Sequence, residues 1–174
     1  MKPGVCFALL CALNFLEAKK YKVKLISVGK CPLPAETLDA SEPVLYEAAA
    51  RRLDRRTSVI RANFTVRRAV GPVLMNFRIY QLSPRRALSF ELARLDCRSP
   101  LTYQLVRVLH LTLDNDCYAQ PGSYVTDNIN LQDFAWILSK VMVTPGKYEY
   151  NLEFGTSKGI ALCTTIMCDI LETK

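Results

Sequence analysis

Residues 147–154 read Lys-Tyr-Glu-Tyr-Asn-Leu-Glu-Phe and form the clearest strand pattern in the chain. Apolar side chains occupy alternate positions of this stretch: Tyr148, Tyr150, Leu152 and Phe154. This period of two predicts a strand with one buried face and one wet face. Pro145-Gly146 predicts a turn before the strand, and residues 157–159 predict a turn after it. Residues 160–171 are apolar on both faces, so we expect a central strand there.

The same alternation recurs upstream in residues 60–66, 73–79 and 88–92. Turn signals at Gly71-Pro72 and Ser83-Pro84 separate the three segments, which together predict an antiparallel meander. The apolar positions expected to face inward include Phe64, Val66, Phe77, Ile79 and Phe90.

The remaining segments complete the predicted fold. Residues 21–28 alternate weakly, residues 122–131 predict a further strand, and residues 35–50 predict a short helix or a loop. Ser99 followed by Pro100 is typical of a helix start, and apolar residues at helical spacing, Leu105 among them, predict three to four turns. Six or more strands and one short helix predict an all-β antiparallel sandwich.

The chain has 174 residues with a formal net charge of +7, and half of its residues are hydrophobic. That length predicts one domain with its own core, and the composition excludes a disordered tail. Residues 5–16 form an apolar run that is too short to span a bilayer and follows a basic start. We therefore expect a signal peptide over residues 1–18, a single domain over residues 19–174, and a secreted protein.

Cysteine usage agrees with that compartment. The chain has seven cysteines, of which Cys6 and Cys11 belong to the expected signal. The remaining five predict two disulfides and one unpaired thiol. Cys163 and Cys168 are five positions apart on one predicted strand, so their side chains face opposite sides of the sheet and are not expected to bond to each other.

Motifs for catalysis are absent from the sequence. His110 is the chain's one histidine, which excludes sites that need two imidazoles and makes a structural or surface role the expectation. We expect no metal site and no cofactor, since cysteine and histidine do not cluster and no glycine-rich phosphate loop occurs. Paired carboxylates of a glycoside hydrolase stay open as a minor alternative, because such pairs meet only in space.

Two short segments carry further hypotheses. Asn63-Phe64-Thr65 is a glycosylation sequon, with Asn63 on the predicted wet face. Residues 134–138 are apolar where a loop is expected, and they include Phe134, Trp136 and Ile137. This segment predicts either a rim loop that dips into a lipid surface or a cap on the core.

Basic charge is concentrated in one stretch. Every arginine lies between Arg51 and Arg107, where only three acidic residues oppose them. Arg61, Arg67 and Arg78 project from the predicted wet faces of neighbouring strands. They predict either a solvated face or a basic patch for anionic lipid headgroups or an acidic partner.

Several motifs together resemble the ML lipid-recognition superfamily, which includes ganglioside activators and insect chemosensory proteins of the CheB type. The resemblance covers about residues 50–171 and rests on four stretches in order: Arg55–Thr57 with Ala62–Val66, Cys117–Tyr124, Pro145–Tyr148, and Ser157–Leu171. The chain has too few cysteines for the disulfides around the helix of ganglioside activators, which favours the insect branch.

The resemblance implies an immunoglobulin-like, cup-shaped β-sandwich with an internal hydrophobic cavity for a lipid. It also implies disulfides Cys97–Cys117 and Cys31–Cys163, with Cys168 left as the thiol. It places Trp136 near an apolar rim loop. The implied cavity residues are Phe64, Val66, Phe77, Ile79, Phe90, Leu105, Tyr148, Tyr150, Leu152 and Phe154.

The leading hypothesis is a secreted, monomeric, non-enzymatic protein that binds a lipid or a hydrophobic semiochemical such as a pheromone. A membrane surface or a receptor is a further candidate partner. Nucleic acid is not an expected partner of a secreted protein. The alternative hypothesis is an extracellular β-sandwich that recognises an acidic glycan or a protein through its arginines. A filled core with salt-sensitive heparin binding favours the alternative, and a wide dry cavity favours the leading hypothesis.

Overall fold

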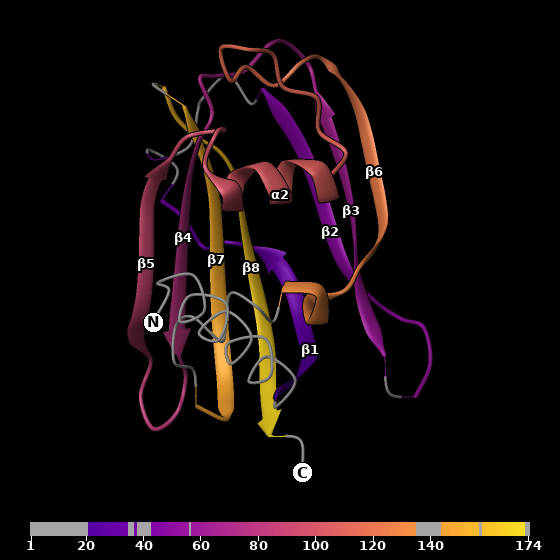
Figure 1. The fold of residues 1–174 in the computed structure, drawn as a ribbon, viewed down its shortest axis with the longest axis vertical. Helices are drawn as coiled ribbons and strands as arrows, with labels where there is room; N and C mark the ends of the chain where they lie inside the picture. The colour runs from indigo at the N-terminus through magenta and orange to yellow at the C-terminus, as the bar shows by residue number, and fades with distance from the viewer. Residues whose placement is uncertain are drawn as a thin grey trace, which may run out of the picture.

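Two antiparallel sheets pack as a sandwich in the computed structural model, which describes residues 21–34, 37, 43–55, 57–134, 144–156 and 158–172. The larger sheet has the strand order β1-β8-β7-β4-β5 and the smaller sheet has the order β2-β3-β6 (Figure 1). The strands are β1 (Tyr21–Lys30), β2 (Val44–Arg52), β3 (Ser58–Val66), β4 (Leu74–Gln81), β5 (Ala87–Leu95), β6 (Gly122–Ile129), β7 (Gly146–Thr156) and β8 (Gly159–Glu172). The all-β prediction is confirmed.

The C-terminal half follows its sequence pattern closely. Tyr148, Tyr150 and Phe154 of β7 are buried at alternate positions, as predicted. β8 lies between β1 and β7, which confirms the central position inferred from its two apolar faces. Burial on both sides explains why its sequence shows no alternation.

The predicted meander is wrong in its first connection. β3 pairs with β2 and β6, whereas β4 pairs with β5 and β7, so residues 67–73 carry the chain from one sheet to the other. Gly71 sits in this crossover, where an added Cβ would lie 2.9 Å from the Cys117 carbonyl oxygen. Alternation identifies the buried face of a strand but carries no information about its partner.

The helix or loop predicted over residues 35–50 is wrong for residues 44–50. Residues 44–52 form strand β2, which pairs along its whole length with β3. Three consecutive alanines, Ala48 to Ala50, favour a helix in isolation, but Val44, Tyr46 and Ala48 turn inward and supply a buried face. Tertiary packing therefore overrides the local preference.

One α-helix, α2 (Pro100–Val108), is present in the described residues, and Figure 1 shows it lying across the opening between the sheets. The Ser99 side chain caps it, as predicted, by accepting from the Thr102 backbone N–H at 3.3 Å. Its nine residues make about two and a half turns, fewer than predicted. The helix ends early because His110 adopts a positive φ of 54° and is exposed.

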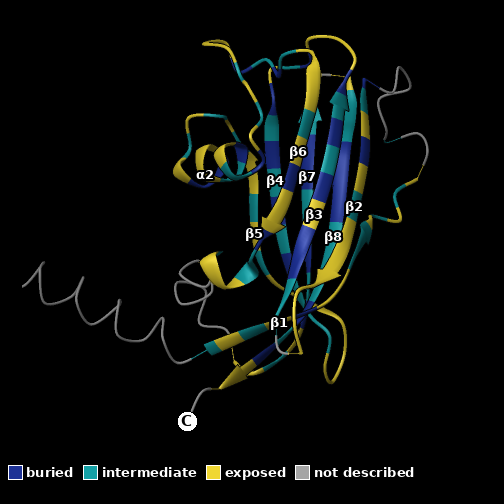
Figure 2. Ribbon diagram, turned by 90° about the vertical axis from the view of Figure 1, so that its right-hand side faces the viewer, coloured by how far each residue is buried: buried dark blue, intermediate teal, exposed yellow. Residues whose placement is uncertain are grey.

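The core lies between the sheets, where buried positions line up along the facing strands (Figure 2). Two disulfides stabilise its periphery. Cys31–Cys163 ties the end of β1 to β8, and Cys97–Cys117 brackets α2. Cys168 is a buried free thiol on the same strand as Cys163. Two disulfides are typical of proteins that mature in an oxidising environment.

Within the described ranges, no helix has the length and apolar character needed to cross a membrane.

Candidate ligand cavity

A cavity of about 110 Å³ lies between the two sheets. Its walls come from both sheets, from α2, and from the 3-10 helix η3 (Leu131–Phe134). Six of the ten predicted cavity residues line it: Phe64, Phe77, Leu105, Tyr150, Leu152 and Phe154. They come from four different elements, β3, β4, α2 and β7, so the period-2 pattern and the helical spacing both selected faces that meet in the fold.

The other four predicted residues do not line this cavity. Val66 lines a second, smaller cavity. Ile79 and Tyr148 are fully or almost fully buried in packed regions of β4 and β7, and Phe90 is partly buried on β5. The Tyr148 hydroxyl donates to the Thr144 carbonyl at 2.8 Å. Alternation predicts which way a side chain points, but not where along a strand the sheets separate enough to leave space.

The sequence did not predict the cavity residues that come from β2 and β8. Tyr46 and Ala48 belong to β2, which the sequence did not predict as a strand. Leu162, Thr164 and Ile166 of β8 also line the cavity. The β8 residues could have been found by following every second position of a strand that was already predicted.

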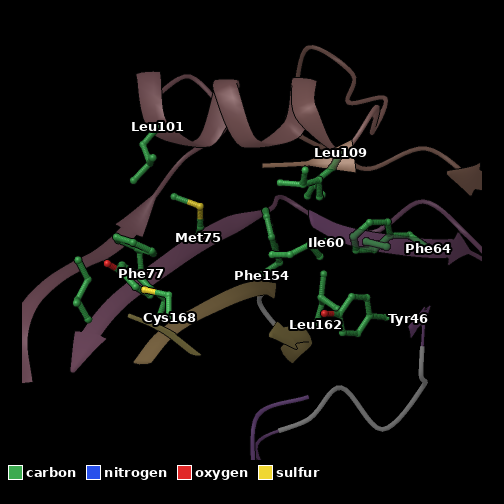
Figure 3. Close-up of a cluster of buried hydrophobic side chains, with 14 of the residues drawn as sticks. Tyr46, Ile60, Phe64, Met75, Phe77, Leu101, Leu109, Phe154, Leu162 and Cys168 are labelled. Atoms are coloured by element: carbon green, nitrogen blue, oxygen red, sulfur yellow. The ribbon is translucent and has the colours of Figure 1, made fainter. Parts of the chain in front are cut away.

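The smaller cavity of about 30 Å³ adjoins the first. Four side chains line both: Phe64, Leu109, Phe154 and Leu162. Figure 3 shows these four labelled residues converging from a strand of the smaller sheet, the segment after α2, and two strands of the larger sheet. We call them the waist, because they separate two apolar spaces that lie along the same sandwich interior.

Three polar side chains reach the wall of the main cavity. Thr164 donates a hydrogen bond to the Tyr46 hydroxyl, so each of these two polar groups has a hydrogen-bond partner within the wall. The Tyr150 hydroxyl is buried with no oxygen or nitrogen partner in the described part of the chain, and the Cys168 thiol lies beside it. Burial raises the pKa of Tyr150 far above its usual range and raises the pKa of Cys168 to about 12.

Charged side chains do not line the main cavity within the described residues. The single histidine of the chain, His110, lines a different hollow, which is polar. The described residues also contain no group of three potential metal ligands. The chemistry that this space offers is therefore the burial of apolar surface, aided by the rings of Phe77 and Tyr150, which stack at 6.0 Å.

The predicted arginine patch is not assembled. Arg61 lies on the outer face of the smaller sheet and pairs with Asp127 at 2.9 Å. Arg78 lies on the outer face of the larger sheet and pairs with Glu91 and with the buried Glu153. Arg67 is exposed just beyond β3. Because β3 and β4 belong to different sheets, their wet faces point in opposite directions.

Asn63 lies on the outer face of β3, half-buried between Glu47 and Val125 of the neighbouring strands. Its side-chain oxygen is buried and has no hydrogen-bond partner among the described residues. Phe134 lines the main cavity at the end of η3. Trp136 and Ile137, predicted with it as a rim loop, lie outside the described residues.

No protein-family model matches the chain, and a search of curated proteins found no match.

Proposed function

We propose that this protein is a secreted, non-enzymatic carrier of a lipid or another hydrophobic small molecule. The observation that carries the proposal is the apolar cavity between the sheets, since native cores normally pack without space for a guest. Each methylene buried there contributes about 0.8 kcal/mol before the entropy of binding is deducted. Burial of a single acyl chain can therefore supply the free energy needed for binding without any polar contact.

Secretion and family membership belong to the same proposal. The apolar N-terminal run and the two disulfides support secretion. The resemblance to the ML lipid-recognition superfamily supports a lipid-like ligand, and its insect branch supports a semiochemical in chemosensation. The glycan-binding alternative rested on a patch of Arg61, Arg67 and Arg78, and these arginines share no common surface, so we do not pursue it.

Adjacent alanines of β2 provide a matched test. Ala48 lines the main cavity, whereas Ala49 is exposed on the other face of the strand. Ala48→Phe fills the cavity, and Ala49→Phe adds the same side chain to solvent. We expect the unaltered protein and Ala49→Phe to bind a fluorescent fatty-acid probe, and Ala48→Phe to lose most of that binding while keeping the same circular dichroism spectrum.

Lipid extraction from protein secreted by eukaryotic cells gives an independent readout. We expect mass spectrometry to find a co-purified hydrophobic ligand on the unaltered protein and much less on Ala48→Phe. If the unaltered protein carries no ligand and binds no probe, the carrier function is wrong.

A further inference from the structure

The main cavity can hold a hydrocarbon chain but not a polar head. Its lining contains no charged residue in the described part of the chain, its Tyr46 and Thr164 hydroxyls bond to each other, and its Tyr150 hydroxyl is buried beside Cys168. An ionised head placed there would lose its hydration without gaining a partner, which strongly disfavours that position. The head of an amphiphilic ligand must therefore lie outside the cavity.

A second space adjoins the cavity where such a head would emerge. It is a hollow of about 430 Å³ between β1, the β2–β3 turn and the start of η3. Val23 lines both the hollow and the cavity. Leu131 lines the cavity, and its chain neighbours Asn130 and Gln132 line the hollow. Figure 1 shows β1, η3 and the β2–β3 turn together at one end of the sandwich.

The charged residues of this hollow have one sign. Four basic residues line it, and we call it the basic hollow: Lys22, Lys24, Arg52 and Arg55. No acidic residue lines it in the described ranges, and none of the four forms an ion pair with a described residue. Arg52 instead donates to the backbone carbonyls of Asp54 and Arg55, at 2.9 and 3.3 Å. Positive charge therefore predominates among the residues that line this hollow.

The hollow on the other side of η3 has the opposite character. It is lined by Asp127, Asp133 and His110, and Asp127 already pairs with Arg61. Both hollows share residues with the apolar cavity, so charge is what distinguishes the two routes for a head group. An anion is attracted to the basic hollow and repelled by the acidic one.

The position of η3 relative to β1 is fixed by one side chain. Gln132 accepts from the Val23 backbone N–H at 3.0 Å and donates to the Tyr21 carbonyl, also at 3.0 Å. These two bonds hold the boundary between the cavity and the basic hollow in place before a ligand arrives, and such preorganisation lowers the cost of binding.

We propose that the ligand is a single-chain amphiphile with an anionic head, a carboxylate or a phosphate, whose tail occupies the main cavity and whose head lies in the basic hollow. This inference rests on the carrier function proposed above and specifies its ligand class.

Three probes with the same alkyl chain test the head group: laurate, dodecyl phosphate and dodecanol. The test variant replaces the four basic residues with glutamine, Lys22→Gln, Lys24→Gln, Arg52→Gln and Arg55→Gln. The control variant makes an identical change of charge at exposed positions that line no described cavity, Lys30→Gln, Arg67→Gln, Arg85→Gln and Lys158→Gln. Affinities are measured by calorimetry at low and high salt.

We expect the test variant to lose about tenfold in affinity for at least one anionic probe and to keep its affinity for dodecanol. High salt should reproduce that loss in the unaltered protein, and the control variant should behave like the unaltered protein. The probe that loses more identifies the head as carboxylate or phosphate. If the test variant loses as much affinity for dodecanol as for the anionic probes, or if both variants lose the same affinity, the proposal of an anionic head is wrong. Such a result leaves the carrier function standing. If the unaltered protein binds none of the probes, the carrier function fails as well.

Discussion

Thr164 of β8 donates a hydrogen bond to the hydroxyl of Tyr46 of β2, and this bond joins the two sheets across the wall of the main cavity. Both residues are buried. Burial raises the pKa of Tyr46, and the bond from Thr164 acts in the opposite direction. The Tyr46 ring also stacks on Phe64 at 5.3 Å, so one side chain contributes to the link and to the waist.

A double-mutant cycle measures this link. Tyr46→Phe should lower the free energy of unfolding by about 1–2 kcal/mol, because Thr164 is left without its partner in an apolar wall. Thr164→Val should have a similar cost. The double variant should lose clearly less than the sum, since neither polar group then remains. Urea unfolding supplies the values, and strictly additive losses would show that the bond does not form.

Two arginines that the sequence assigned to one patch should differ in their effect on stability. Arg78 pairs with Glu153, whose side chain is 6% exposed, whereas Arg61 pairs with Asp127, which is 50% exposed. Arg78→Met should cost about 2 kcal/mol because, among the described residues, it leaves the buried Glu153 carboxylate with only Asn76 as its side-chain hydrogen-bond donor. Arg61→Met should cost less than about 1 kcal/mol. Thermal or urea unfolding distinguishes these values, and equal losses would contradict the burial difference.

The two disulfides close loops of very different length. Cys31–Cys163 spans 132 residues and Cys97–Cys117 spans 20. Chain-entropy arguments assign about 5 kcal/mol to the long loop and about 3 kcal/mol to the short one. Replacing each pair with alanines should therefore destabilise the protein more when the long loop is opened. Comparison of the two unfolding midpoints tests this order, and the reverse order would show that local packing dominates.

Cys168 should be inert in the folded protein. Burial raises the pKa of its thiol to about 12, so at pH 8 only about one molecule in ten thousand carries the reactive thiolate. We expect an aromatic disulfide reagent to label no thiol in the native chain beginning at residue 19. In denaturant, without reductant, it should label one thiol per chain. Cys168→Ser should abolish that signal, and rapid labelling of the native protein would contradict the buried position.

The sequence predicts the strands of this fold far better than their partners. The alternating residues of β7 and the doubly apolar β8 identify both strands and even the central place of β8. Gly71-Pro72 looks like a hairpin turn, but it lies in a crossover between sheets. Pairing depends on contacts between residues far apart in the chain, which a local pattern does not encode.

The candidate site also has one part that the sequence predicts and one part that it does not. Helical spacing and strand alternation predict that Leu105 and Tyr150 face a common interior. The basic hollow could not be predicted, because Lys22, Arg52 and Asn130 come from three segments that meet only in the folded chain. Its arginines belong to the charge-rich stretch noted in the sequence, but its lysines do not.

Gln132 has a consequence for how copies of this protein meet one another. β1 is an edge strand of the larger sheet, and such edges expose backbone groups that can recruit a strand from another chain. The side-chain amide of Gln132 occupies the Val23 N–H and the Tyr21 carbonyl, two groups that an incoming strand would need. One glutamine thus removes two of the free hydrogen-bonding groups that a strand from a second copy would need at this edge.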